Sequence, residues 1–300
     1  MLNRFKGSFM LLIAAMIWGT AFAAQSSGMK YVEPFTYNSI RTIIGGTVLI
    51  PVIALFRKNG NKYDNKKAGF KTSFRGGIFC GIILFAASSL QQYGISLTSA
   101  GKAGFITALY VVIVSLIGFF TGKHSGKRIW LCVLIAVCGF YLLCVSRTLS
   151  ISRGDIYVLL SAFFYALHII AIDRFNSNNA DSMIMSCVQF FTAGTVMLIC
   201  MFIFESPSFN SIIAARYTIL YTGVMSCAVA YTLQIIGQRY THPAIATLIM
   251  SLESVFAALS GWLILGEKLS FEELSGCFLV FSAVISAQPD ISFKKTKKDL

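Results

Sequence analysis

GSFMLLIAAMIWGTAF (Gly7–Phe22) recurs in the second half of the chain as GDIYVLLSAFFYALHI (Gly154–Ile169). The two segments align without gaps and set Trp18 opposite Tyr165. Self-similarity at a long period marks a duplicated structural unit. The chain therefore reads as two related halves.

Later matches keep the same order along the chain. GTVLI from Gly46 pairs with GTVML from Gly194, and LQQYGISLTSAGKAGFI from Leu90 pairs with LQIIGQRYTHPAIATLI from Leu233. This register aligns further residues, namely Gln91 with Gln234, Gly94 with Gly237, and Tyr110 with Glu253. The duplication extends over the whole chain, although identity between the halves is low.

The composition places the duplicated units in a membrane. Of the 300 residues, 56% are hydrophobic and 12% are charged, and the mean hydropathy is +0.73. Crossing the hydrocarbon takes roughly 20 apolar residues as a helix. Ten runs approach that length: Ser8–Ala24, Phe35–Phe56, Gly76–Leu97, Ala103–Gly122, Ile129–Val145, Gly154–Ile172, Asp181–Phe204, Tyr217–Gln238, Ala244–Leu265 and Phe271–Ala287. They lack the two-residue alternation of barrel strands, so we predict an all-α integral membrane protein with ten transmembrane helices.

The basic residues predict the orientation. With the N-terminus in the cytoplasm, 18 of the 25 Lys and Arg residues fall on the inner side, six on the outer side and one, Arg41, within a span. This asymmetry predicts both termini inside. The net charge of +13 is thereby explained by the lipid bilayer as partner, and the basic tail 291–300 by contact with anionic lipid. We expect no nucleic-acid binding.

Each repeat contains five spans, so the second must enter the membrane from the opposite side. We predict a first repeat over 1–148 and an inverted second repeat over 149–290. Inverted repeats are common in secondary transporters, which hold their substrate site near the midplane at the repeat interface. The basic and apolar start of the chain imitates a signal peptide, but its removal would leave nine spans, so we expect it to remain.

Enzyme and metal signatures are missing from the sequence. It contains no P-loop, HExxH or GxSxG motif, and its eight cysteines fall within predicted spans without a CxxC pair. A membrane-embedded enzyme would gather Asp, His or Ser side chains in a catalytic arrangement, whereas Asp155, Asp173 and Asp181 are isolated at span ends. We expect no cofactor, no metal and no catalytic residues. A channel would line a path with repeated polar residues, whereas the polar residues here form one central belt.

Three segments carry a family resemblance: AAMIWGTAF (14–22), AGFITALYVVIVSLIG (103–118) and SLESVFAALSGWLILGEKLSFEELSG (251–276). They resemble the drug/metabolite transporter superfamily, in its EamA-type branch. The resemblance implies an inner-membrane carrier with a 5+5 inverted-repeat fold that exports amino acids or other small metabolites. One departure is Ser254, where family members often have Pro. Without that Pro, we expect a straighter ninth helix.

Glu253 is the most informative polar residue. It follows Pro243 by ten residues, roughly 15 Å along a helix, which is about half the hydrocarbon thickness. An ionised side chain there costs at least about 2.5 kcal/mol, so it should face the bundle interior. A carboxyl at this depth can carry a proton or bind a substrate amino group. The alternative is a structural carboxyl bonded to neighbouring Ser or backbone groups.

Other polar and aromatic residues lie at a similar depth. Ser88 with Gln91 and Tyr231 with Gln234 are three apart and share helix faces. We expect these faces to point inward, either to bind substrate or to join helices. Candidate residues for the cavity wall are Trp18, Tyr110 and Tyr165, for which core packing is the alternative.

Three further residues receive separate predictions. His168 follows Tyr165 by three residues and is a candidate proton relay or substrate ligand, or a packing residue. Arg41 lies about six residues into its span, near the predicted outer end, where its side chain can reach the interface, so we predict a structural role. Glu267 ends the ninth span and is also predicted to be structural.

The sequence therefore predicts a secondary transporter that exports a small organic solute by alternating access. Amino acids, nucleobases or sugars, and amphipathic drugs remain open as substrates. Proton antiport through Glu253, with His168 as a second candidate, and uncoupled export remain open as mechanisms. Monomer and homodimer are both open.

Overall fold

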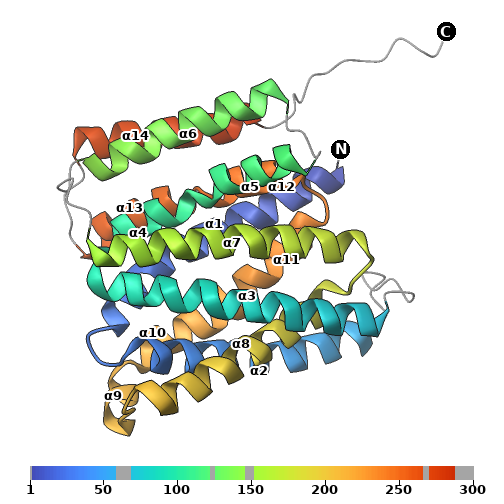
Figure 1. The fold of residues 1–300 in the computed structure, drawn as a ribbon, viewed down its shortest axis with the longest axis vertical. Helices are drawn as coiled ribbons and strands as arrows, with labels where there is room; N and C mark the ends of the chain where they lie inside the picture. The colour runs from blue at the N-terminus through green and yellow to red at the C-terminus, as the bar shows by residue number, and fades with distance from the viewer. Residues whose placement is uncertain (1, 59–68, 122–125, 146–151, 266–269, 288–300) are drawn as a thin grey trace.

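The computed structural model describes residues 2–58, 69–121, 126–145, 152–265 and 270–287, in which every regular element is a helix. The long helices lie side by side in one bundle (Figure 1). In chain order the elements are α1 (Leu2–Gly28), α2 (Pro34–Lys58), α3 (Phe70–Leu97), α4 (Ala100–Ala108), α5 (Tyr110–Phe120), α6 (Lys127–Val145), α7 (Arg153–Ser177), α8 (Ser182–Phe204), α9 (Phe209–Ala214), α10 (Arg216–Tyr221), the π-helix η1 (Thr222–Tyr231), α11 (Thr232–Gln238), α12 (Pro243–Met250), α13 (Glu253–Leu265) and α14 (Phe271–Ala287).

Eight helical segments within these ranges are long and apolar enough to cross a membrane. They are Phe5–Gly28, Pro34–Leu55, Phe70–Leu97, Ala100–Phe120, Arg153–Ser177, Ser182–Phe204, Arg216–Gln238 and Pro243–Leu263. The other two predicted spans form α6 and α14, which pack along each other at one edge of the bundle (Figure 1). The protein is thus an all-helical membrane protein, and the full count of ten spans stays a prediction.

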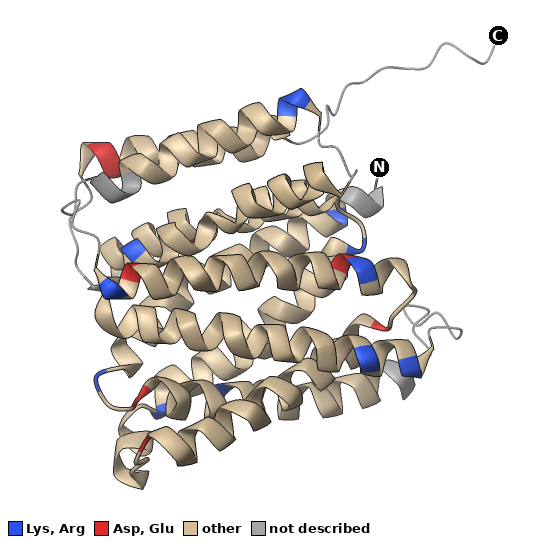
Figure 2. Ribbon diagram, viewed as in Figure 1, with Lys and Arg blue, Asp and Glu red and all other residues tan. Residues whose placement is uncertain are grey.

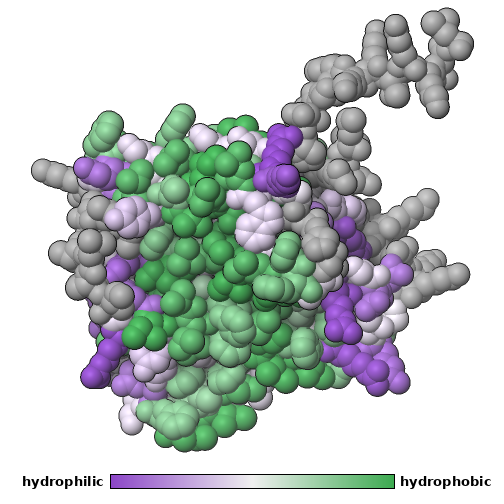
Figure 3. All heavy atoms as spheres, turned by 45° about the horizontal axis from the view of Figure 1, so that its top comes forward, coloured by the Kyte–Doolittle hydropathy of each residue, from purple (hydrophilic) through white to green (hydrophobic). Residues whose placement is uncertain are grey.

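The surface of the bundle is arranged for contact with lipid. Large hydrophobic side chains are exposed on its flanks, among them Phe79, Ile203 and Phe278. Figure 3 shows hydrophobic residues over the middle of the visible face and hydrophilic residues toward its sides. Charged residues gather at the helix ends (Figure 2). An apolar belt between polar rims is what a helical bundle needs to lie in a bilayer.

Polar side chains cap several helix ends. Ser152 and Asp155 form a capping box at the start of α7, and the Asp181 carboxylate accepts from the backbone N–H groups of Met183 and Ile184 at the start of α8. At the start of α2, the Glu205 carboxylate accepts from Phe35 N at 2.7 Å. These caps satisfy N–H groups that have no partner within their own helix.

The two halves run in opposite directions. Figure 1 shows α1 and α7, the first helix of each half, beginning at opposite ends of the bundle. The helices that pack against them are also equivalent in the two halves. α7 packs against α3, and α1 packs against α11. The third helix of each half thus packs against the first helix of the other half.

Paired glycines mark these two contacts. A Cβ built on Gly94 would lie 2.9 Å from the carbonyl oxygen of Gly154, and one on Gly237 would lie 3.0 Å from that of Gly7. The sequence repeat aligns Gly94 with Gly237 and Gly7 with Gly154, so the contacts are equivalent. Small residues at both positions let the helix backbones approach closely.

We expect Gly94→Leu and Gly237→Leu each to destabilise the fold by about 1–3 kcal/mol, because a side chain would enter an already packed contact. Thermal unfolding of the purified protein in detergent measures the effect. Gly126→Leu is the matched control, because no atom lies within 4 Å of a Cβ at that position. Equal melting temperatures for all three variants would show that the paired contacts are not tight.

Candidate functional site

Two spans are interrupted at equivalent positions. Leu109 separates α4 from α5, which begins at Tyr110. Ser251 and Leu252 separate α12 from α13, which begins at Glu253. The residues that the repeat aligns, Tyr110 and Glu253, are therefore each the first residue after a break. Breaks inside spans are frequent around the binding sites of secondary transporters.

An interruption of the helical pattern lies before Glu253 in the ninth predicted span. It occurs without a Pro at position 254. The Ser251 hydroxyl donates to Leu248 O at 2.8 Å, and the Ser254 hydroxyl donates to Ser251 O at 2.8 Å. Such side-chain hydrogen bonds compete with the helical backbone pattern, so the two serines contribute to the interruption at this position.

A cavity of about 40 Å³ lies where the two halves meet. Seven residues of each half line it, namely Trp18, Phe22, Gln25, Arg41, Gln91, Thr107 and Tyr110, and Tyr165, Ile169, Ser226, Tyr231, Gln234, Met250 and Glu253. This space holds about three water molecules. Sites for organic ligands have roughly 300–1,000 Å³, so the space in this structure is smaller than such a site needs.

Seven of the nine predicted substrate-binding residues line this cavity, and two do not. Ser88 donates to Leu84 O within its own helix at 2.6 Å. The ring of His168 is fully buried, and its Nε2 lies 3.0 Å from Gln189 Oε1. It packs edge-on against Tyr231, with ring centroids 6.0 Å apart. His168 thus lies outside the cavity wall, beside one of the residues that form it.

Hydrogen bonds link the cavity wall across four helical elements. The Tyr231 hydroxyl donates to the Tyr165 hydroxyl at 3.4 Å, and that hydroxyl donates to Gln91 Oε1 at 2.9 Å. Gln91 Nε2 donates in turn to the Thr107 hydroxyl at 3.1 Å. This chain joins η1, α7, α3 and α4, and so connects the two halves. Buried networks of this kind rigidify the site they surround.

The π-helix η1 brings two of its residues to the cavity. Ser226 and Tyr231 are five positions apart, which in an α-helix would set them about 140° apart around the axis. The wider turn of a π-helix, with its i to i+5 pattern, brings such residues close to one face. Opposite this element lies Gly45, whose added Cβ would meet Cys227 Cβ at 2.5 Å. A side chain at Gly45 would therefore push η1 away from α2.

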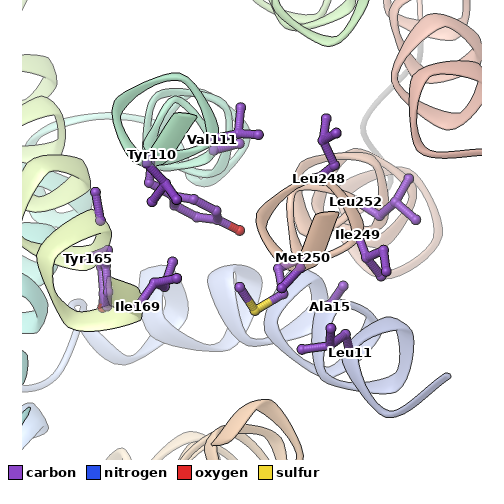
Figure 4. Close-up of a cluster of buried hydrophobic side chains, with 14 of the residues drawn as sticks. Leu11, Ala15, Tyr110, Val111, Tyr165, Ile169, Leu248, Ile249, Met250 and Leu252 are labelled. Carbon is purple, nitrogen blue, oxygen red and sulfur yellow. The ribbon is translucent and has the colours of Figure 1, made fainter. Parts of the chain in front are cut away.

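Glu253 is buried at 4% exposure on the second half's side of the cavity. Its neighbour is Tyr110, whose ring points toward α12 in Figure 4. Tyr110 is the polar side chain that interacts with this carboxyl, whose Oε1 has no hydrogen-bond partner among the described residues. A buried carboxyl without a cation beside it is stabilised when it gains a proton or a positively charged ligand. This group is therefore chemically available to whatever enters the cavity.

Arg41 differs from its predicted place. The sequence indicates a side chain that reaches the membrane interface, whereas the structure buries it at 4% exposure in the cavity wall. The repeat aligns Arg41 with Gln189, the buried partner of His168. A polar residue at the same place in both halves is the signal that could have identified it. The predicted structural residue Glu267 lies outside the described residues.

The remaining wall residues were missed for a simple reason. Gln25 lies near the end of α1, Thr107 precedes the break after α4, Ser226 lies in the π-helix, and the other three, Phe22, Ile169 and Met250, are apolar. Sequence position alone does not show that such residues turn toward a cavity.

We expect Tyr165→Phe to lower the free energy of unfolding by about 1–3 kcal/mol, because Gln91 Oε1 would lose its buried donor. Tyr110→Phe is the control: its hydroxyl takes no part in the network of Tyr231, Tyr165, Gln91 and Thr107, and its removal should cost less. Thermal unfolding in detergent compares the two. A larger loss for Tyr110→Phe would contradict the described network.

Comparison with known proteins agrees with these observations. The model of the EamA-like transporter family matches residues 5–145 and again 152–287. An uncharacterized transporter of Archaeoglobus fulgidus is 30% identical over 92% of this chain and 83% of its own length. The uncharacterized transporter YoaV of Bacillus subtilis is 20% identical over 90% and 92%, respectively.

A protein of known crystal structure shares the fold with a TM-score of 0.76, at 17% identity over 94% of this chain and 96% of its own. The family matches both halves of the chain, and the related proteins with a stated activity are transporters. The chain therefore belongs to the EamA-like transporter family of the drug/metabolite transporter superfamily and is a membrane transporter, not an enzyme.

Proposed function

We propose that the protein is a secondary transporter that exports a small organic solute, such as an amino acid or a related metabolite, across the inner membrane. In this proposal ten helices span the membrane, both termini are cytoplasmic, and the units 1–148 and 149–290 move against each other. The observation that carries the proposal is the cavity between the halves, next to two broken spans and lined by the buried carboxyl of Glu253.

The two ends of the bundle support alternating access. Where α4 and α7 begin, Lys102 Nζ and Asp155 Oδ2 form an ion pair at 2.6 Å, and the Thr98 hydroxyl donates to Asp155 Oδ1 at 2.9 Å. These contacts hold α4 and α7 together. A cavity of about 480 Å³ lies at the opposite end, between α5, the end of α7 and the start of α12. Within the described residues, an ion pair thus joins α4 and α7 at one end, and a cavity lies at the other.

Proton coupling is the mechanism that the cavity favours over uncoupled export. Glu253 is the carboxyl group among the residues that line the cavity, and it has no cation beside it in the described structure. Proton binding and substrate binding at one such group exclude or favour each other, which links the two gradients. His168 is less suited to this role, because it lies outside the cavity lining.

We expect Glu253→Gln to abolish solute uptake driven by a pH gradient in proteoliposomes, while solute exchange without a gradient continues, because the amide cannot carry the proton. Glu33→Gln, at an exposed carboxylate, is the matched control and should behave as wild type. Solutes for the assay come from a thermal-shift screen of metabolites, since a specific ligand stabilises the folded state. Unchanged gradient-driven uptake by Glu253→Gln would rule out proton antiport through this residue.

Alternating access further requires that α4 and α7 separate at the Lys102–Asp155 end. In a background without the eight native cysteines, Lys102→Cys with Asp155→Cys gives a pair that a short bifunctional thiol reagent can join. We expect joining to stop transport, and a reagent cleaved by reduction to restore it. Each single cysteine variant, treated in the same way, is the control. Full transport by the joined protein would contradict opening at this end.

A further inference from the structure

Arg41 is a cation in the wall of the central cavity. It lies on α2, with 4% exposure, among the residues that line this space. Its Nε donates to Asn38 Oδ1 at 2.8 Å. The guanidinium carries further N–H donors on its two terminal nitrogens, and these make no hydrogen bond with any described residue. Most of the hydrogen-bonding capacity of this group is therefore unused.

The surrounding residues fix the position of the guanidinium. Asn38 is fully buried, and its Nδ2 donates to Ser88 O at 2.9 Å, which orients its Oδ1 toward Arg41. The centroid of the Tyr37 ring lies 5.7 Å from the guanidinium carbon. Asn38, which is bonded to α3, and the Tyr37 ring restrict the rotation of the Arg41 side chain before a ligand binds. Such preorganisation raises affinity for a ligand of matching shape.

The charge of Arg41 is not balanced by the protein around it. Within the described ranges, no carboxylate lies within ion-pair distance of its guanidinium. Glu253 lines the same cavity but neighbours Tyr110, whereas Arg41 neighbours Tyr37 and Asn38. Burying a cation without a counter-ion costs free energy. A fold that retains such a cation leaves it able to bind an anionic ligand.

From this geometry we infer that Arg41 binds a carboxylate of the transported solute and thereby selects carboxylate-bearing solutes. The inference rests on the proposed transport function and narrows its substrate class. The guanidinium fork matches a carboxylate with two parallel hydrogen bonds. A cationic amphipathic drug would meet an uncompensated positive charge at this end of the cavity and is disfavoured. Sugars and nucleobases lack the anion that this residue requires.

The test compares each carboxylate with its uncharged counterpart. The panel consists of the common L-amino acids, lactate and succinate, each beside its amide, with binding measured by thermal shift and uptake measured in proteoliposomes. We expect wild type to bind at least one carboxylate of the panel and to bind its amide about 10- to 100-fold more weakly. Arg41→Gln should remove this preference. Arg41→Lys should retain part of it, since the charge remains without the fork.

Asn38→Asp supplies an internal anion where Asn38 Oδ1 now accepts from Arg41 Nε at 2.8 Å, and it removes the Nδ2 donor to Ser88 O. We expect this variant to bind the carboxylate at least about tenfold more weakly, because the guanidinium is already neutralised. An Arg41 with a purely structural role would leave carboxylate binding unchanged in Asn38→Asp. This variant keeps the inference testable if Arg41→Gln fails to fold.

The possible results distinguish a failure of the inference about Arg41 from a failure of the proposed transport function. Equal uptake of a carboxylate and its amide, with Asn38→Asp unchanged, would overturn the role of Arg41 and leave transport intact. No uptake of any solute by wild type would count against the proposed transport function, and against this inference with it.

Discussion

The absence of water in the hydrocarbon core is the constraint on which the rest of this structure depends. A polar side chain there must find a partner inside the protein, because lipid offers none. The helices of this protein turn aromatic and aliphatic side chains outward and collect hydroxyl and amide groups in the interior, together with Arg41 and Glu253. The central cavity is the place where these groups meet without fully satisfying one another. Gln25, Gln234 and Glu253 each retain an unpaired polar atom there within the described structure.

The inverted duplication determines how the helices pack, and the residues that differ between the two halves determine the chemistry of the cavity. Equivalent glycine pairs hold the first and third helices of opposite halves together, and equivalent breaks interrupt α4–α5 and α12–α13. At the aligned positions, however, the residues differ in kind. One half has Tyr110 where the other has Glu253, and Arg41 where the other has Gln189. The symmetric scaffold therefore places a carboxyl group at one point of the cavity wall and a guanidinium group at another. The cavity is chemically asymmetric for this reason.

The sequence was sufficient to predict the features that depend on local composition or on the internal repeat. Apolar run length predicted the helices, and the repeat pointed to Glu253, because its alignment with Tyr110 and its distance from Pro243 fix its depth. The direction in which each side chain points around its helix axis was harder to predict. Ser88 and His168 share faces with Gln91 and Tyr165, yet neither lines the cavity. Residues three apart differ by about 60° around a helix, which suffices to turn one into a packed contact.

Arg41 and the π-helix mark the limit of sequence reasoning. α2 begins at Pro34, so Arg41 lies two turns inside the helix and faces the bundle. Only the packing of α2 on α3, α8 and η1 determines that direction. The π-helix lies close to α2, where a Cβ on Gly45 would meet Cys227 Cβ at 2.5 Å, and the local sequence pattern does not predict this contact.

The account depends on one cavity that faces each side of the membrane in turn. Ser226→Cys, placed in that cavity in a background without native cysteines, tests this most directly through its reaction with a membrane-impermeant thiol reagent. We expect labelling from either side of oriented proteoliposomes, slowed from both sides by a transported solute. Labelling from one side only, under every gradient and solute condition, would contradict alternating access through this cavity.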